Sequence, residues 1–394
     1  MKATPGWILL LAVLLASGAR AAHAQQEDMD RFRALFRQAT AALAADDTAG
    51  YRKGLEQAYP FLPARHLNRP FVQYHLARAY AMTGDSLSAA RWLSQMLADR
   101  IEGLMLYYTA YDRAFDRVRA TKPIKDVLRT VDTLEVTATH VQGNVYLLEG
   151  AGCQIAAQVG QDGILLVDAG YSLAAPAVLR ALAGISKAPI RYVINTHYHE
   201  DHVGGNATLG AGATVVAHPK ARDALLEPQT FIEGVVVPPH TGRSLPTLLV
   251  ENSVTIEFNG ETVRVVPLPG HTEGDLIVGF EGSNVVHMGD RYFAGASPYI
   301  WPGSDVDTYV ATMDSLLATL TPDTKVIAGH GPLTPAAALN ASYQATLELI
   351  DFVRMAVAAN KSVDQAKAMG KDRGFPEPWV AGIFEVLTEA RTEE

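Results

Sequence analysis

Four side chains that can bind metal ions lie close together in the middle of the chain. The stretch Asn-Thr-His-Tyr-His-Glu-Asp-His-Val-Gly-Gly-Asn contains His197, His199, Asp201 and His202. If these groups were buried without a metal ion or a partner, each uncompensated charge would be costly. A solvated surface loop could also carry them, but that interpretation requires coincidence at every position. The stretch therefore predicts a metal site.

The chain directly before this stretch predicts where the site lies. Ile190–Ile194 is an apolar run that favours a strand. In α/β proteins, ligands concentrate beyond the carboxyl ends of strands, where loops carry function on a rigid scaffold. The single cysteine, Cys153, lies in a setting typical of a strand start, and we interpret it as a small buried hydrophobe. Histidine and carboxylate must then supply the metal ligands.

The second half of the chain alternates short apolar runs with helical patterns. Such alternation is typical of α/β layers with helices on both outer faces. The segment Glu227–Pro246 contains four prolines, and we expect it to be an irregular binding loop or lid. Helices are expected at 176–182, 305–320, 335–359 and 363–392, with breaks in the last at Gly374 and Pro376. The expected strands are 134–139, 144–148, 154–159, 163–167, 190–194, 213–217, 253–258, 262–267, 276–280, 284–286 and 325–328.

The region before residue 130 has the spacing of helices rather than strands. One helix is expected from Phe71 to Met82, and Asp85 or Ser86 could cap the next. The pattern of small and large residues resembles a tetratricopeptide helix pair at Leu76, Ala77, Tyr80, Ala89 and Leu93. This helical region could bind a protein partner or a substrate, or it could serve as a structural cap.

The first 24 residues are typical of a secretory signal peptide. Lys2 precedes the apolar run Trp7–Ala16, and Ala22-His23-Ala24 offers a cleavage site. The run is too short for a comfortable membrane span, so we expect no membrane anchor after cleavage and a periplasmic or secreted protein. This segment holds two of the 33 basic residues and none of the 42 acidic ones, so its removal leaves a net charge of about −11. Such a charge argues against nucleic acid as a partner and leaves a small-molecule substrate.

The pattern His-x-His-x-Asp-His after a strand resembles the signature of the metallo-β-lactamase superfamily. The rest of that family's pattern follows in order over about residues 134–359: Asp168 in Leu-Leu-Val-Asp-Ala-Gly, His271 in Pro-Gly-His-Thr-Glu-Gly-Asp, Asp290 in Val-Val-His-Met-Gly-Asp and His330 in Ala-Gly-His-Gly-Pro. The resemblance implies an α/β fold, an αββα sandwich with metals at one edge, preceded here by a small all-helical domain. We expect a signal peptide at 1–24, a helical domain at 25–130, the catalytic domain at 131–360 and a C-terminal helical extension at 361–394.

The resemblance also implies roles for these residues. One metal ion would be held by His197, His199 and His271, and a second by Asp201, His202 and His330. Asp290 would bridge the two ions. Asp168 would orient the histidine loop from outside the ligand set. An alternative for Asp168 is a turn residue before Gly170.

Two Zn²⁺ ions per chain fit a ligand set of imidazole and carboxylate without thiolate. A metal-bound hydroxide would then attack the carbonyl of an amide, lactam, lactone or (thio)ester in a small substrate of the exported compartment. Asp201 would orient this nucleophile and shuttle a proton. Tyr292 and Phe293 are candidates for the pocket wall or an oxyanion donor, with simple packing as the alternative. His240, in the proline-rich segment, could also reach the substrate.

Departures from particular subfamilies narrow these expectations. Cysteine-liganded β-lactamases have Cys where this chain has Asp290, which disfavours that subclass. The seven ligands resemble those of glyoxalase II, but only Val363–Glu394 stands in place of its basic, glutathione-binding helical domain. An iron-dependent dioxygenase of the same fold and a non-catalytic binding protein are the alternatives. The substrate, the choice among zinc, iron and manganese, and the oligomeric state stay open.

Overall fold

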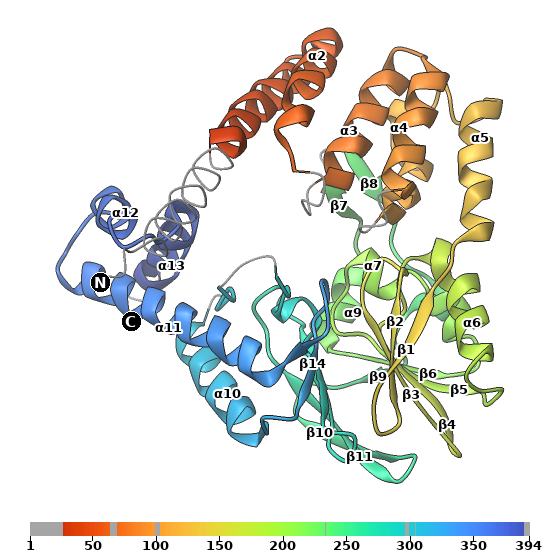
Figure 1. Ribbon diagram of the computed structural model, residues 1–394, viewed down its shortest axis with the longest axis vertical. Helices are drawn as coiled ribbons and strands as arrows, with labels where there is room; N and C mark the ends of the chain where they lie inside the picture. Colours follow the sequence, from red (N-terminus) through yellow and green to blue (C-terminus); the bar gives the residue numbers. More distant parts are fainter. Residues whose placement is uncertain are drawn as a thin grey trace, which may run out of the picture. The chain divides into compact units, whose positions relative to one another are not determined.

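The computed structural model describes residues 27–63, 69–98, 103–232, 234–295, 299–303 and 305–389 (Figure 1). The expected signal peptide at 1–24 lies outside the described residues. The chain forms two compact units, Met1–Thr130 and Val131–Glu394. The first is built from helices and the second from two large sheets with helices.

The first unit is a set of short helices around an apolar core, which confirms the predicted helical region. Residues 27–44 are helical, and the elements that follow are α2 Thr48–Ala58, α3 Arg69–Met82, α4 Ser86–Ala98 and α5 Lys122–Arg129. Asp85 caps α4, because its carboxylate accepts a hydrogen bond from the backbone N–H of Ser88. Four residues of the predicted helix pair are buried on α3 and α4, namely Leu76, Ala77, Ala89 and Leu93, whereas Tyr80 is only partly buried.

Three polar contacts lie inside this helical core. The guanidinium of Arg78 lies 3.0 Å from the carboxylate of Asp112, and both side chains are buried. The hydroxyl of Tyr74 donates to the same carboxylate at 3.0 Å. His75 is buried on α3 and pairs with the hydroxyl of Tyr51. The unit therefore depends on charged and titratable groups as well as on apolar packing.

The second unit begins with a seven-stranded sheet in the order β1-β2-β3-β4-β5-β6-β9. Neighbours are antiparallel from β1 to β4 and parallel from β4 to β9. Parallel pairing places the carboxyl ends of β4, β5 and β6 at one edge of this sheet. The strands are β1 Thr137–Gln142, β2 Val145–Glu149, β3 Ile155–Gly160, β4 Gly163–Val167, β5 Ile190–Ile194, β6 Thr214–Ala217 and β9 Leu248–Leu249.

A six-stranded sheet in the order β10-β11-β12-β13-β14-β15 completes the pair. Its neighbours are antiparallel except for β13 and β14, which run parallel. The strands are β10 Val254–Phe258, β11 Glu261–Pro267, β12 Leu276–Phe280, β13 Val285–His287, β14 Lys325–Ile327 and β15 Thr334–Pro335.

The two sheets pack face to face across one apolar core. Leu165 and Ile194 of the first sheet belong to the same buried cluster as Val265 and Val278 of the second. The other face of the second sheet is covered by the helices α10 Val306–Thr319, α11 Ala336–Ala358 and α13 Glu377–Glu389. On the first sheet, α6 Ala175–Ala183 lies beside β1 with its apolar side buried. This layering confirms the expected αββα sandwich.

Three local expectations need correction. The first strand begins at Thr137 rather than at 134, because residues 130–133 form a 3₁₀ turn. The segment Glu227–Pro246 is not wholly irregular, since it contains a hairpin of β7 Gln229–Ile232 and β8 Val235–Val237. The strands β9 and β15 were also not expected, and each is only two residues long.

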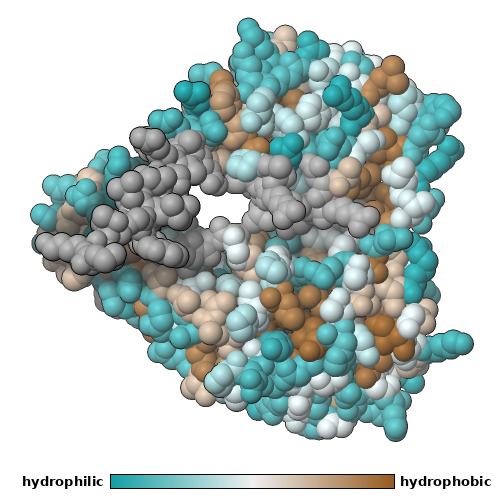
Figure 2. Space-filling model, viewed as in Figure 1, coloured by the Kyte–Doolittle hydropathy of each residue, from teal (hydrophilic) through white to brown (hydrophobic). Residues whose placement is uncertain are grey.

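The C-terminal stretch forms two helices, α12 Val363–Lys371 and α13 Glu377–Glu389. They are separated at Gly374, whose φ is +79°, and at Pro376, as the sequence predicts. Figure 2 shows hydrophilic residues over much of the visible face, with apolar residues gathered in separate patches. Within the described part of the chain, no helix combines the length and the apolar character that a membrane crossing requires.

Candidate metal centre

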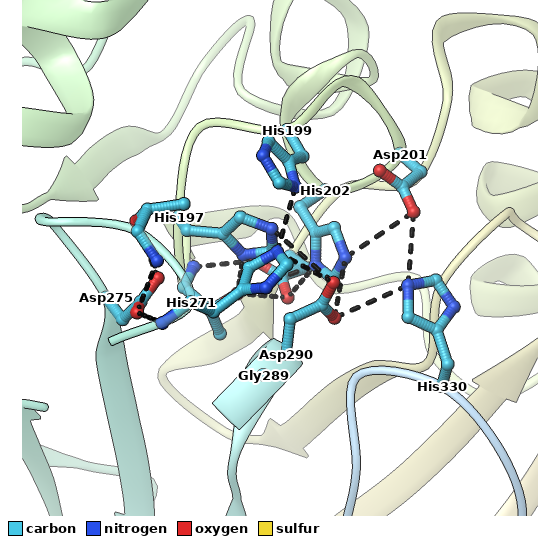
Figure 3. Close-up of polar contacts among 12 residues, drawn as sticks. His197, His199, Asp201, His202, His271, Asp275, Gly289, Asp290 and His330 are labelled. Atoms are coloured by element: carbon cyan, nitrogen blue, oxygen red, sulfur yellow. Dashed lines mark hydrogen bonds and ion pairs between the residues drawn. The ribbon is translucent and has the colours of Figure 1, made fainter. Parts of the chain in front are cut away.

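The seven predicted ligands come together at one edge of the sandwich, from four loops that each follow a strand (Figure 3). The loop after β5 leads into the short helix α7 Glu200–Val203 and carries four of them. Because the carboxyl ends of these strands meet at one edge, residues more than a hundred positions apart become neighbours. The other ligands are His271 between β11 and β12, Asp290 in the turn Gly289–Arg291 after β13, and His330 after β14.

The first cluster consists of His197, His199, His271 and Asp290. One ligand atom from each of these residues lies within 4.8 Å of all the others. The Nε2 atom of His271 is 3.0 Å from Nδ1 of His199 and 3.3 Å from Oδ2 of Asp290. The Nε2 atom of His197 is 3.7 Å from the same Oδ2. Three histidine nitrogens and one carboxylate oxygen therefore face a common point.

The second cluster consists of Asp201, His202 and His330, whose ligand atoms also lie within 4.8 Å of one another. Oδ2 of Asp201 is 3.2 Å from Nε2 of His330 and 3.6 Å from Nε2 of His202. The loop carrying His330 approaches Asp290 so closely that a Cβ at Gly329 would lie 2.0 Å from Oδ1 of Asp290. Only glycine fits at this position.

Asp290 lies between the two clusters and gives one carboxylate oxygen to each. Its Oδ2 faces the first cluster, as the distances to His197 and His271 show. Its Oδ1 is 3.1 Å from Nε2 of His202 and 3.3 Å from Nε2 of His330. This is the geometry that a carboxylate shared by two metal ions requires.

Several buried atoms of the clusters fit metal ligands better than they fit hydrogen bonds. Nε2 of His197, Nε2 of His202 and Oδ1 of Asp290 are buried and make no hydrogen bond of acceptable geometry within the described residues. Buried polar groups without partners are rare and costly, which points to an ion that would satisfy them. Imidazole and carboxylate donors fit zinc and similar divalent metals.

Asp168 fixes the loop after β5, which carries His197, His199 and His202, by accepting hydrogen bonds from two of its residues. Its carboxylate accepts hydrogen bonds from the backbone N–H of Thr196 at 2.7 Å, the Thr196 hydroxyl at 2.8 Å and Nδ1 of His202 at 2.7 Å. Because Nδ1–H of His202 donates to this carboxylate, its Nε2 lone pair faces the clusters. Asp168 adopts a φ of +67°, an uncommon conformation for a residue other than glycine.

Burial and mutual charge shift the pKa values of His197, His199 and Asp290 in the direction that metal binding needs. Burial also opposes the charged form of His202, but the acidic groups around that ring outweigh this effect and raise its pKa. Burial first, and the neighbouring His271 second, lower the pKa of His199 to about 4. Burial also lowers the pKa of His197 well below its ordinary value. Burial opposes ionisation of Asp290, but the histidines around it outweigh this effect and hold its pKa well below the usual range. Neutral histidines and an ionised carboxylate are the states that bind metal ions.

Sequence reasoning did not identify Thr196 or Asp275 as parts of this site. The carboxylate of Asp275 accepts from the backbone N–H groups of His271 and Thr272, both at 2.8 Å, and from the Thr272 hydroxyl at 2.6 Å. Asp275 thus fixes the backbone of His271. Asp275 is the last residue of the short motif that contains His271, four positions before it. This position in the motif is the signal from which its role could have been predicted.

The three predicted pocket residues lie in different surroundings. The Phe293 ring stacks on His330 at 5.3 Å between centroids and meets His271 edge-on at 5.9 Å, so it borders both clusters. Tyr292 is buried in the core between the second sheet and its helices. His240 lies 2.6 Å from the buried carboxylate of Glu200.

Cys153 is buried, as predicted, and it lies beside the site. Its Sγ forms a group within 4.8 Å with ligand atoms of Asp168 and His202. Burial is the main reason that the pKa of this thiol is raised, which keeps it protonated. Its place beside His202 is a finding of the fold, because no spacing in the sequence links Cys153 to a metal ligand.

An αββα sandwich with two adjoining histidine–aspartate clusters at one edge defines a metal-binding α/β protein. The model of the metallo-beta-lactamase superfamily matches residues 138–351, more than half of the chain. The chain belongs to the metallo-β-lactamase superfamily, which confirms the resemblance in its sequence.

Among curated relatives, hydroxyacylglutathione hydrolase of Synechococcus sp. (strain JA-2-3B'a(2-13)) is 33% identical over 141 residues, which cover 35% of this chain and 48% of that protein. The protein of the same name from Gloeobacter violaceus is 31% identical over 113 residues, covering 28% of this chain and 38% of that protein. The chain thus spans about half the length, or less, of these relatives.

Solved structures with a similar arrangement include the metallo-beta-lactamase from Pontibacter korlensis. It is 16% identical with a TM-score of 0.42, and the match covers 53% of this chain and 97% of that one. A B3 metallo-beta-lactamase described as having an active site glutamic acid is 22% identical with a TM-score of 0.41, covering 55% of this chain and 92% of that one.

Proposed function

We propose that this protein is a dinuclear zinc hydrolase that cleaves an amide, lactam, lactone or (thio)ester bond in a small substrate. The observation that carries the proposal is the position of Asp290, which gives Oδ2 to one histidine cluster and Oδ1 to the other. A site for one metal ion would not need a carboxylate that faces both ways. Two clusters that share a carboxylate are the arrangement that two-metal hydrolysis uses.

The residues present fit two zinc ions. His197, His199 and His271 would hold the first ion, Asp201, His202 and His330 the second, and Asp290 both. When bound, such a pair of ions supplies Lewis acidity that polarises a carbonyl and brings the pKa of a water molecule to about 7. The chain's own residues must orient that water, accept its proton and shield the reaction.

Asp201 is the side chain best placed to handle the proton. Its Oδ2 points at His202 and His330, yet 17% of the side chain stays exposed, more than for Asp290 at 5%. An aspartate that keeps some exposure to solvent can accept a proton from the attacking water and return it to the leaving group. Phe293 covers His330 with its ring and would exclude solvent on that side.

The comparisons support an acyl-bond substrate without identifying it. The relatives are named hydroxyacylglutathione hydrolase, so a thioester belongs in the set of candidate substrates. The match covers about half of those proteins, and glutathione itself is therefore not carried over. The proposal of an exported protein rests on residues 1–24 alone.

The geometry favours hydrolysis over the iron-dependent dioxygenase. An enzyme that uses one iron ion would need the first cluster only, and it would leave Asp201, His202 and His330 without a role. Those three residues nevertheless converge within 4.8 Å, and two of them are almost fully buried. A non-catalytic binding protein would have no need for either cluster.

The test is a panel of esters, thioesters, lactones and lactams offered to metal-free and zinc-reconstituted protein, with the metal content measured in each sample. We expect close to two zinc ions per chain and hydrolysis of at least one substrate class only in the loaded sample. One tightly bound iron ion with no zinc uptake would overturn the proposal. Equal turnover by the metal-free protein would also overturn it.

A further inference from the structure

Gln154, the residue just before β3, makes hydrogen bonds to the backbone on both sides of His330. The backbone N–H of Gln154 donates to the carbonyl of Gly329 at 2.9 Å. Its side-chain Nε2–H donates to the carbonyl of Gly331 at 2.8 Å. These carbonyls flank His330 directly, so Gln154 fixes the backbone on either side of that histidine.

Gln154 is also linked to the turn that carries Asp290. Its backbone carbonyl accepts a hydrogen bond from Nε2 of His287 at 2.9 Å. Nδ1 of His287 in turn accepts from the backbone N–H of Gly289 at 3.1 Å. The fully buried His287 ring therefore connects Gln154 with the residue next to Asp290.

The two residues before Gln154 lie against the remaining members of the second cluster. Cys153 forms a close group with His202 and Asp168. Gly152 has a φ of +110°, and a Cβ there would lie 3.3 Å from Cβ of Asp201. The same Cβ would lie 2.4 Å from the Tyr171 ring, so a larger residue would force movement beside the site.

We infer that Gly152, Cys153 and Gln154, called the support segment here, form a positioning element for the second metal ion. Each residue of the segment meets a different ligand of that ion: Asp201, His202 or His330. The first cluster has a separate support, because Asp275 fixes the backbone of His271. The side chain of Gln154 bonds only to the His330 loop, so its removal should weaken the second position more than the first.

This inference rests on the proposed two-metal function. It adds which residues determine how fully zinc occupies each metal position. Groups that orient metal ligands from outside usually change metal affinity by roughly 10–100-fold when they are removed. Different supports allow the two positions to have different zinc affinities. Such a protein would lose one zinc ion before the other as the zinc concentration falls. The support segment determines the zinc concentration at which that change occurs.

The test is Gln154→Leu, which removes the side-chain hydrogen bond to Gly331 and keeps the backbone bond to Gly329. Metal-free protein is titrated with Zn²⁺ against a competing chelator, so that two binding steps are resolved without an activity assay. We expect one step, assigned to the second position, to lose roughly 10–100-fold in affinity and the other step to change by less than about threefold. Gln154→Met, a closer match in shape, is measured in parallel in case the first variant does not fold.

Gln158→Leu is the matched control. It makes the same substitution four residues further on, in β3, at a fully buried glutamine whose Nε2 donates to Phe258 and Glu261 rather than to the site; Gln154 itself is partly buried. We expect both zinc steps to match the parent in this variant. Asp275→Ala should give the opposite pattern, with the loss confined to the step assigned to the first cluster.

The outcomes separate the inference from the proposed function. If the parent binds two zinc ions and the Gln154 variants keep both steps unchanged, the support segment has no positioning role. Equal losses in both steps, or the same loss in Gln158→Leu, would also overturn the inference while leaving the two-metal centre intact. If the parent itself binds fewer than two zinc ions, the proposed function fails first.

Discussion

Replacing Asp168 by Asn tests how the histidine loop is held, because the change keeps the shape of the side chain and removes one acceptor. The carboxylate accepts from three donors: the backbone N–H and hydroxyl of Thr196, and Nδ1 of His202. An amide has one oxygen and one NH₂ group. Whichever way it is placed, its NH₂ group faces at least one donor that the carboxylate satisfied.

The two placements of the amide have different costs. If its NH₂ faces the backbone N–H of Thr196, that buried donor loses its acceptor. If it faces His202, the ring must place its proton on Nε2, and the lone pair that would bind the second metal is lost. From the usual effect of such orienting groups, we expect zinc affinity at the second position to fall by roughly 10–100-fold, or ~1.4–2.7 kcal/mol.

The assay is a competitive zinc titration of Asp168→Asn beside Asp162→Asn. Asp162 lies just before β4 and Asp168 just after it. The control therefore makes the same substitution at the end of the strand that is away from the site. The Asp162 carboxylate accepts from the backbone N–H of Asn259 on the surface. We expect parent-like zinc binding in that control. Parent-like binding in Asp168→Asn as well would refute the orienting role of Asp168.

The other predictions concern the bridge and the helical unit. Asp290→Ala should weaken the second zinc and lower kcat more than tenfold, and unchanged metal content and kcat would place Asp290 outside the centre. Burial, with a smaller effect of the Arg78 charge, lowers the pKa of His75 to about 3 from 6.5. The fold therefore favours neutral His75, and stability should be complete above pH 6.5 and fall by up to ~1.4 kcal/mol per pH unit towards pH 3. Urea unfolding at several pH values would measure this loss of stability in the parent and in His75→Gln. If the free energy of unfolding depends on pH equally in both proteins, His75 is not the cause. Asp112→Ala should destabilise the helical unit by ~3–5 kcal/mol because it leaves Arg78 buried without a counterion. The exposed Asp116→Ala should cost less than ~1 kcal/mol, and similar melting shifts in both would contradict the account.

The convergence of the seven candidate ligands could be predicted because each sits in a short motif beside a strand. Four of the seven occur within six consecutive positions, and the others follow runs whose apolar character is plain in the sequence. The burial of these strands on both faces, as in Gly163–Val167, leaves little ambiguity about their type. Local pattern was therefore enough to locate the edge of the sandwich at which the ligands meet.

The supports of the site could not be predicted, because they depend on contacts between distant parts of the chain. Gln154 bonds to Gly331, which is 177 residues away, and no motif links the two positions. Cys153 gave no signal because a lone buried thiol is usually a packing residue. Tyr292 and Phe293 are adjacent in the sequence, yet alternation sends one ring into the core and the other over His330.

In the proline-rich segment Glu227–Pro246, the sequence pattern led to a wrong prediction of irregular structure. Its prolines indicated an irregular loop, but the runs Gln229–Ile232 and Val235–Val237 pair as a hairpin in a small sheet of their own. The second of these runs consists of three valines, which favour strands, but the prediction gave more weight to the four prolines. The strand β9 is weaker still, since it pairs with β6 through only two residues.

The most direct test of the central claim is anomalous diffraction at the zinc absorption edge from crystals of the zinc-reconstituted protein. Two peaks about 3.5–4 Å apart are expected. One should lie among His197, His199 and His271, and the other among Asp201, His202 and His330, with one oxygen of Asp290 beside each. A single peak at full occupancy, or two peaks that Asp290 does not touch, would contradict this claim.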